Sequence, residues 1–242
     1  MTTADKPATS GHRFRTILDV ITAVATVTAA AAVVWALVIR RPQSVARSPT
    51  SDSQRSVPVP AEPVAIEGSP VLGDPAAPLA MIAFSDFECP FCGRFAKDVF
   101  PSIKTNYLQT GKVKFVFKHL PLSDLHPRAE RAAAVAACAA MQGKFWALHD
   151  ELFTDPKKLE DADLASYRKK VGLDDAQVRS CLNGEAKGRI DQDTALAKAL
   201  SIRGTPTFLL GRVQGDGRVK VVQVVAGALP AAEFSARLDE IR

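Results

Sequence analysis

The sequence predicts an α/β fold, a sheet flanked by helices, and three observations support this fold class. An apolar run at 79–85 is typical of a buried strand, and it leads into a segment with apolar residues at every fourth position, which is typical of a helix. The alternating run at 112–117 predicts a second strand with one buried face. Runs at 207–210 and 220–225 then predict a hairpin, after a long block of helices.

The N-terminal part of the chain contains a long apolar segment. Residues Ile17–Ile39 are apolar almost throughout, and Val20–Ile39 is a run of 20 residues without a charge. A helix of this length can cross a hydrocarbon core of about 30 Å. A cleaved signal peptide is the alternative, but its apolar core is usually only about 7–15 residues long. The longer run, which ends at Arg40 and Arg41, favours an uncleaved membrane anchor.

Two polar segments flank this predicted transmembrane helix of residues 17–39. Residues 1–16 are predicted to form a cytoplasmic tail. Residues 40–65 are rich in Pro, Ser, Arg and Val, a composition that cannot bury a core and predicts a disordered linker. Positive charges are nearly balanced across the span, so its orientation is inferred from the cysteines, because stable disulfides belong outside the cytosol. The folded domain is expected over residues 66–242.

Apolar periodicity and glycine stops predict the helices of this domain. They are expected over residues 90–109, 127–140, 145–153, 163–171, 174–182, 185–200 and 230–241. Pro101 should kink or split the first of them, because proline removes a backbone donor and clashes with the preceding turn. Gly111 is typical of a helix end.

The formal net charge of +5 does not point to nucleic acid. Lysines and arginines are scattered among acidic residues, and no basic cluster alternates with aromatic residues. A solvated surface is therefore the expected role of these charges.

Cys89 and Cys92 form a C-x-x-C pair between the first strand and the helix that follows it. A helix N-terminus carries unpaired backbone N–H groups and partial positive charge, which together stabilise a thiolate. Pro90 suits the first helical position, because its missing N–H has no partner there. The pair therefore predicts a dithiol that cycles with a disulfide.

A single C-x-x-C pair is also compatible with half a zinc site or with a structural disulfide. A zinc site needs two further ligands at comparable spacing. The other cysteines, Cys138 and Cys181, are far apart, and the four histidines form no H-x-x-x-H pair. A redox pair is favoured over both alternatives, and no metal is expected.

Several separated motifs resemble one family. They are FSDFECPFC at 84–92, KFVFKHLPL at 114–122, HP at 126–127, CA at 138–139, GKFW at 143–146 and GTPTF at 204–208. These motifs resemble the DsbA-like branch of the thioredoxin superfamily, and in particular its membrane-anchored bacterial members. The resemblance implies a thioredoxin fold, a mixed sheet flanked by helices, with a helical insertion at about 125–188.

The resemblance also implies a function and roles for the cysteine pair. Cys89 would be the exposed attacking cysteine, and Cys92 the resolving one, in an extracytoplasmic thiol–disulfide oxidoreductase. The enzyme would be held in the cell (inner) membrane by one span, with its catalytic domain on the periplasmic side. It would form or exchange disulfides in cysteine-containing exported proteins. A DsbB-type or vitamin K epoxide reductase-like membrane partner would reoxidise the pair, and no bound cofactor is needed.

Other functions remain open at this point. The same cysteine pair would serve a disulfide reductase or isomerase. A redox-inert binding or chaperone-like domain, with the pair as a structural clasp, is the alternative from another class.

The resemblance also implies which residues contact substrate. Thr205 and Pro206 would form a loop that faces the cysteine pair, with Pro206 in the cis form. Such a backbone edge can pair with an extended segment of a substrate. Pro90 and Phe91 are expected to contribute to the same surface. An ordinary loop turn is the alternative for the Thr205–Pro206 segment.

One departure from the superfamily pattern concerns proton transfer. Members often carry a buried carboxylate six residues before the attacking cysteine, where this sequence has Ala83. Without this acid, the means of deprotonating the second cysteine is an open question. Asp86 and Glu88 are expected to be solvated turn residues. His119 and His126 are expected to be surface histidines, and contact with the active site is the alternative for both.

Cys138 and Cys181 both fall within the predicted helical insertion. Outside the cytosol, two remaining cysteines more often pair than stay free, which predicts a structural disulfide. Two buried free thiols, packed as small hydrophobic side chains, are the alternative.

Overall fold

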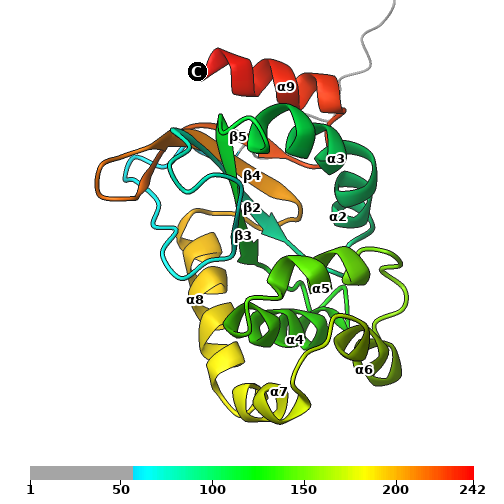
Figure 1. Ribbon diagram of the computed structural model, residues 1–242. Coiled ribbons are helices and arrows are strands. Elements are labelled where there is room, and N and C mark those ends of the chain that lie inside the picture. Colours follow the sequence, from blue (N-terminus) through cyan, green and yellow to red (C-terminus); the bar gives the residue numbers. More distant parts are fainter. Residues whose placement is uncertain (1–56) are drawn as a thin grey trace, which may run out of the picture. The chain divides into compact units, whose positions relative to one another are not determined.

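In the computed structural model, which describes residues 57–242, a five-stranded sheet lies between layers of helices (Figure 1). The predicted tail at 1–16, the transmembrane helix at 17–39 and most of the linker at 40–65 lie outside the described residues. Within residues 57–242, none of the helices combines the length and the apolar character that a bilayer crossing requires.

The sheet has the strand order β1-β3-β2-β4-β5. The strands are β1 (Val71–Leu72), β2 (Leu79–Ser85), β3 (Val113–His119), β4 (Thr207–Val213) and β5 (Val219–Ala226). Strands β2 and β3 are parallel, whereas the other neighbours are antiparallel, so the sheet is mixed as predicted. Strand β1 was not predicted, because two residues are too few to show an alternating pattern.

The register of the central strands brings three loops to one edge of the sheet. Ser85, at the end of β2, lies opposite His119, at the end of β3. Phe84 lies opposite Thr207, the first residue of the antiparallel strand β4. The loops that follow β2 and β3 and the loop that precedes β4 therefore meet at this edge.

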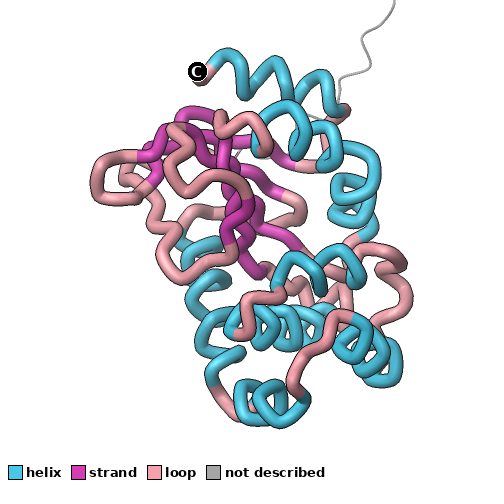
Figure 2. Tube along the Cα trace, in the orientation of Figure 1, coloured by secondary structure: helices cyan, strands magenta, loops and turns pink. Residues whose placement is uncertain are grey.

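Helices account for most of the remaining described chain (Figure 2). After β2 come α2 (Pro90–Arg94), the π-helical segment η1 (Phe95–Val99), α3 (Phe100–Ile103) and a second π-helical segment η2 (Lys104–Leu108). Between β3 and β4 lie α4 (Ala129–Met141), α5 (Phe145–Leu152), α6 (Asp161–Lys170), α7 (Asp175–Leu182) and α8 (Glu185–Ala199). Helix α9 (Ala231–Glu240) follows the last strand.

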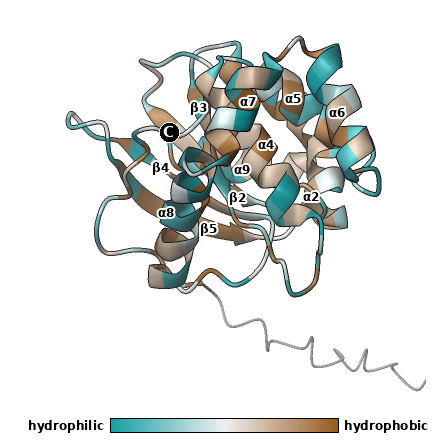
Figure 3. Cartoon of the chain, turned by 90° about the horizontal axis from the view of Figure 1, so that it is seen from below, coloured by the Kyte–Doolittle hydropathy of each residue, from teal (hydrophilic) through white to brown (hydrophobic). Residues whose placement is uncertain are grey.

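Three apolar clusters hold these layers together. One sheet face packs against η1, α3, η2 and α9, and the other face packs against α8. The third cluster lies among helices α4 to α7 and includes both cysteines of the C-x-x-C pair. Figure 3 shows the strands coloured as largely hydrophobic, in keeping with their burial. The pair therefore lies where the sheet layer meets the inserted helices.

The chain from Pro90 to Leu108 is continuous helix, but its turns change in width around Pro101. The N–H of Phe100 donates to Phe95 five residues back, so the turn just before Pro101 is widened. A wider turn relieves the clash between a proline ring and the preceding carbonyl groups. The predicted disruption at Pro101 thus takes the form of a π-helical turn.

Strand β3 differs from its prediction, because both of its faces are buried. Helices cover the sheet on both sides, so the polar positions of the alternating pattern do not reach solvent. Lys114 donates from its ammonium group to the carbonyl of Pro75, and Lys118 forms a 3.0 Å ion pair with Asp193. A buried lysine is tolerated here because each ammonium group has a partner.

The packed part of the chain begins before Ile66. Val64 is 3% exposed and exchanges two backbone hydrogen bonds with Val219, of 2.8 and 2.9 Å. Arg218 also donates to the carbonyl of Pro63 at 2.7 Å. Residues at the end of the segment predicted as linker therefore extend the sheet edge formed by β5.

Candidate active site

Cys89 occupies the N-cap of helix α2, directly before Pro90 at the first helical position. Its backbone carbonyl accepts from the N–H of Gly93 at 3.0 Å, and its own N–H donates to Asp86 at 3.3 Å. The buried strand β2 thus delivers Cys89 to the start of the long helical segment. Cys92 lies one turn later and is also a free thiol.

The loop before β4 completes the site. The Sγ atom of Cys89 lies 3.4 Å from the carbonyl oxygen of Thr205. The Thr205–Pro206 peptide bond is cis, and the carbonyl of Pro206 accepts from the N–H of Gly227 at 2.8 Å. The structure therefore places the predicted Thr205–Pro206 loop directly against the cysteine pair.

The two thiols have opposite pKa shifts. The pKa of Cys89 falls from 9.0 to about 6, mainly because the Cys92 side chain donates a hydrogen bond to its thiolate. Burial opposes this effect, and the backbone N–H groups of Cys92 and Phe91 add to it. At neutral pH Cys89 is therefore largely the nucleophilic thiolate.

The pKa of Cys92 is raised well above its ordinary value. Burial is the main cause, and the nearby Cys89 charge adds to it. Hydrogen bonds from the Ser85 side chain and from the Asp86 backbone lower the pKa but do not outweigh burial. Cys92 is 1% exposed, so it can react with Cys89 but offers no surface to a partner chain.

A dithiol of this kind can exchange disulfides, because the Cys89 thiolate attacks and Cys92 then closes the ring. Within residues 57–242, no group of three or more His, Cys, Asp or Glu side chains is arranged to hold a metal ion.

Comparison with known proteins agrees with this geometry. The model of the family described as thioredoxin matches residues 65–226. The chain belongs to the thioredoxin family. Within this family it is a DsbA-like protein, in line with the resemblance of its motifs.

Three relatives illustrate the match. The Bacillus subtilis protein named disulfide bond formation protein D is 30% identical over 155 residues, which are 59% of this chain and 68% of that protein. The Wolbachia pipientis alpha-DsbA1 crystal structure has a TM-score of 0.63 and 24% identity, covering 74% of this chain and 92% of that one. A Salinispora tropica protein named Na(+)/H(+) antiporter NhaA 3 is 36% identical over 177 residues, or 73% of this chain. This chain spans about a quarter of that antiporter's length, since the match covers 26% of it.

In this thioredoxin-family site, Cys89 is not the exposed residue that the family resemblance implied. Its exposed fraction is 3%, because it packs against the Thr205 carbonyl and the apolar cluster of the inserted helices. Its neighbours provide the accessible surface, since Pro90 is exposed and Phe91 is 51% exposed. Arg94 lies over the Phe91 ring, 5.2 Å from its centroid. A partner chain would therefore meet Phe91 before its sulfur reaches Cys89.

Asp86 is a buried connector and not the solvated turn residue that we expected. It is 2% exposed, and its carboxylate accepts from the N–H groups of Glu88 and Leu122, at 2.8 and 2.9 Å. It also bonds Nδ1 of His126 at 2.7 Å, which removes His126 from the role of a lone surface histidine. Asp86 thus joins the loop after β2 to the loop after β3.

Glu88 was also expected to be solvated, but Arg128 holds both of its oxygens. The Arg128 backbone N–H donates to one oxygen at 2.6 Å, and its guanidinium donates to the other at 2.9 Å. The guanidinium also donates to Glu160 on the loop before α6. Arg128 therefore compensates the Glu88 charge, and this charge is not among the causes that shift the pKa of Cys89.

His119 was expected at the surface, but it is 1% exposed. Burial lowers the pKa of His119 to about 4, so its ring is neutral at physiological pH. The ring lies among Phe87, Phe117 and Phe145, with centroid separations of 6.3, 5.2 and 5.9 Å. An apolar strand pattern could not reveal this placement, because it depends on the helices that cover the end of β3.

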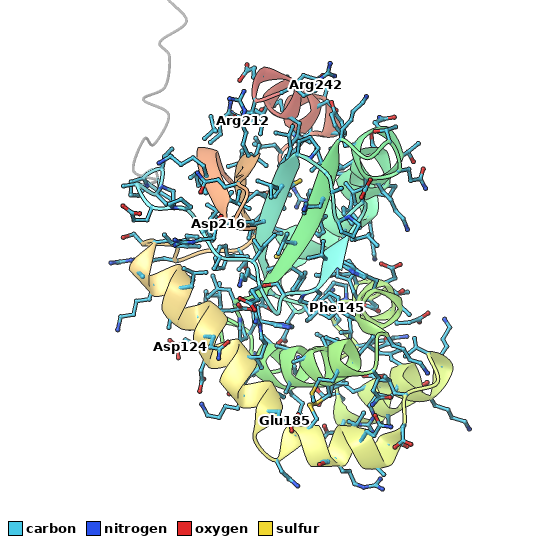
Figure 4. All side chains as sticks on the ribbon, turned by 60° about the vertical axis from the view of Figure 1, so that its left-hand side comes forward. Asp124, Phe145, Glu185, Arg212, Asp216 and Arg242 are labelled. Atoms are coloured by element: carbon cyan, nitrogen blue, oxygen red, sulfur yellow. A yellow bond between two sulfur atoms is a disulfide. The ribbon has the colours of Figure 1, made fainter. Side chains whose placement is uncertain are left out.

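The predicted pairing of Cys138 with Cys181 is present in the structure, with an S–S distance of 2.08 Å and a Cα–Cα distance of 5.7 Å. The bond joins α4 to α7, and Figure 4 draws its sulfur atoms among the inserted helices. The same figure labels Phe145, which lies between the strand ends and these helices. The disulfide is therefore part of the layer that covers the active cysteines.

Proposed function

We propose that this chain is a thiol–disulfide oxidoreductase that forms or exchanges disulfide bonds through Cys89 and Cys92. The observation that carries the proposal is the asymmetry of the pair. The pKa of Cys89 is lowered to about 6 at a helix start, whereas burial raises the pKa of its partner. A clasp that only stabilises a fold needs no such difference, so the redox-inert alternative is not favoured.

In the oxidase direction the cycle begins with the Cys89–Cys92 disulfide. A substrate thiolate attacks the Cys89 sulfur, and Cys92 leaves as a thiolate that takes up a proton. A second substrate thiolate then attacks the substrate sulfur of the mixed disulfide and releases Cys89. The substrate loses two electrons and gains a disulfide, and the cysteine pair gains the two electrons.

The direction of the reaction follows from which state is stabilised. Hydrogen bonds to the Cys89 thiolate stabilise the reduced pair, and a more stable reduced pair is a stronger oxidant. This favours disulfide formation over reduction. The same site would run an isomerase cycle from the dithiol state, with Cys92 resolving the mixed disulfide.

The proposed setting is extracytoplasmic, with the domain tethered by the apolar segment Val20–Ile39 on the periplasmic face of the cell membrane. The Cys138–Cys181 disulfide supports this setting, because such bonds persist in oxidising compartments. The substrates would be exported proteins that contain cysteines. A quinone-linked DsbB-type protein, or one resembling vitamin K epoxide reductase, would accept the two electrons.

The equilibrium of the purified protein with glutathione tests the proposal. We expect the Cys89–Cys92 pair to equilibrate with glutathione buffers and to oxidise a reduced, unfolded substrate protein at neutral pH. A pair that stays unchanged across the range of glutathione buffers, with no substrate oxidation, would show that the cysteines are a structural clasp. Transfer of electrons only from the dithiol to disulfide substrates would instead assign a reductase.

A further inference from the structure

We propose that His119 is the proton acceptor that activates Cys92, and that the Ser85 hydroxyl carries the proton between them. The inference deepens the proposed function, because it concerns the step in which Cys92 resolves a mixed disulfide. In the superfamily pattern a buried carboxylate often accepts the proton of the second cysteine, and this chain has Ala83 at that position. In our proposal His119 takes over this role.

The step needs a base. Cys92 must be a thiolate to attack the Cys89 sulfur, yet burial disfavours its charged form. Ala83 is 1% exposed and carries no titratable group. The nearest carboxylates do not replace it, since Asp86 is occupied by Leu122 and His126, and Glu88 is occupied by Arg128.

The sheet brings Ser85 and His119 together. They are direct partners in the parallel register of β2 and β3, so their Cα atoms are separated by about one strand spacing, ~4.8 Å. Paired residues of neighbouring strands point to the same sheet face. Cys92 belongs to the apolar cluster that contains Phe117 of β3, and the Ser85 side chain is among the groups that lower the Cys92 pKa, so Cys92 is on this face too.

Aromatic contacts confirm the direction of the His119 ring. The ring packs against Phe87 and Phe117, and both belong to the apolar cluster that contains Cys89 and Cys92. Lys118, the preceding residue on β3, points to the opposite face and pairs with Asp193 on α8. His119 is therefore on the cysteine side of the sheet.

The ring nitrogens of His119 are available. Neither Nδ1 nor Nε2 has a hydrogen-bond partner within residues 57–242, although the residue is 1% exposed. Buried polar atoms are seldom left unpaired, and such an exception calls for a physical explanation. The relay requires a hydrogen bond between Ser85 and one of these free ring nitrogens, and in the proposal this bond forms in the mixed-disulfide state.

In the proposed transfer, each proton that one group loses is taken up by the next. The Cys92 thiol gives its proton to the Ser85 oxygen, while the Ser85 hydroxyl gives its own proton to a ring nitrogen of His119. The Cys92 thiolate then attacks Cys89, the Cys89–substrate bond breaks, and the substrate leaves as a thiolate. Ser85 is unchanged, and the imidazolium returns its proton to the released thiolate or to solvent.

Burial is the main reason why the pKa of His119 is low and its ring is neutral between turnovers, and the charged groups around it have smaller effects. Asp193 on α8 accepts the His119 backbone N–H at 2.9 Å, and its negative charge raises the ring pKa. Lys118 and Arg189 lower it, and burial lowers it most. On α5, Asp150 bonds Nδ1 of His149 and not His119. The pair of Cys92 thiolate and imidazolium is neutral as a whole, which allows charge transfer in this buried place.

The test separates the reactions of the two cysteines. The reduced protein reacts with a small aromatic disulfide that releases a coloured thiolate, followed in a stopped-flow instrument from pH 5 to 9. The first release reports attack by Cys89, and the second reports resolution by Cys92. In His119→Phe we expect the second phase to slow by about a hundred- to ten-thousandfold near neutral pH, a typical range for the loss of general-base catalysis. Its rate should then rise steadily with pH, with the first phase unchanged.

His149→Phe is the matched control. His149 is 4% exposed and lies in the same aromatic group, but its Nδ1 bonds Asp150. Phenylalanine suits both positions because the surrounding rings are largely aromatic. Ser85→Ala, a smaller change, should slow the second phase in the same way as His119→Phe.

The experiment distinguishes a failure of the His119 relay from a failure of the proposed redox function. A second phase that keeps the parent rate and pH profile in His119→Phe overturns the inference, and so does an equal loss in His149→Phe. If His119→Phe does not fold, a parent-like second phase in Ser85→Ala overturns the relay. If the parent itself shows no second release, the proposed redox function fails, independently of His119.

Discussion

The Cys89 sulfur lies 3.4 Å from the carbonyl oxygen of Thr205, a residue 116 positions later in the chain. The contact follows from the sheet, because Phe84 at the end of β2 lies opposite Thr207 at the start of β4. Neither loop contains the site alone. The antiparallel pairing of these two strands is what joins the thiolate to the segment that would face a substrate.

The reactivity of Cys89 should titrate far below that of an ordinary cysteine. Only the thiolate is alkylated, so the iodoacetamide reaction rate of the reduced protein should be half-maximal near pH 6. It should be level at higher pH and fall on acidification, as the proton returns to sulfur. In Cys92→Ala the midpoint should rise, because the main hydrogen bond to the thiolate is lost. A parent midpoint above about pH 8, the range of a free cysteine, would contradict the assignment.

Substitution of each active cysteine should have a different effect. Cys89→Ser should abolish disulfide exchange, whereas Cys92→Ala should accumulate mixed disulfides through Cys89, because the resolving thiol is missing. Non-reducing electrophoresis of the reduced variants incubated with a scrambled, disulfide-containing substrate, followed by peptide mapping, measures both, because the Cys89 thiolate needs a substrate disulfide to attack. Cross-links that persist in Cys89→Ser and vanish in Cys92→Ala would reverse the roles.

The buried ion pair on the other sheet face should make a large contribution to stability. Asp193→Ala would leave Lys118 and Arg189 without their carboxylate, and an unpaired buried charge costs about 3–5 kcal/mol. Denaturant titration should show a lower unfolding midpoint. Asp191→Ala is the matched control on the same helix, because the Lys187–Asp191 pair is exposed, and we expect almost no change. Similar midpoints for the two variants would argue against a structural role for the buried pair.

Removal of the Cys138–Cys181 bond should reduce stability without removing exchange chemistry. The bond closes a loop with a sequence separation of 43 residues, for which loop-closure entropy gives a stabilisation of about 4 kcal/mol. The double variant Cys138→Ala/Cys181→Ala should unfold at lower denaturant concentration. Its first-phase reaction with a small disulfide should match that of the parent under native conditions. Loss of that phase in a folded variant would mean that the bond also positions Cys89.

The sequence predicted the fold well where local patterns are strong. The apolar run at Leu79–Ser85 matches β2, and most predicted helices agree with the structure within a few residues. Strand β1 was missed because two residues carry no period. The burial of both faces of β3 was missed because it depends on helices far away in the chain.

The candidate site was predictable as far as the cysteines, because Cys89 and Cys92 combine a motif with a strand–helix context. The residues around them were not. Asp86 and Glu88 follow a strand and resemble turn residues, yet their partners His126 and Arg128 are 40 positions away. His119 lies beside Ser85 only through the register of β2 and β3. Such long-range pairing has no local signature in a single sequence.

The disulfide between α4 and α7 has a consequence for the biogenesis of the protein. Its formation removes two electrons and two protons from the newly made chain, and another molecule must accept them. In the newly made chain Cys89 and Cys92 are also thiols, so this pair cannot be the acceptor. Each new copy therefore needs an oxidant from outside itself before the Cys138–Cys181 bond can form. The protein thus requires, for its own structural disulfide, the same oxidation that we propose it performs on other proteins. Earlier oxidised copies of the protein, or another oxidant, would have to supply it.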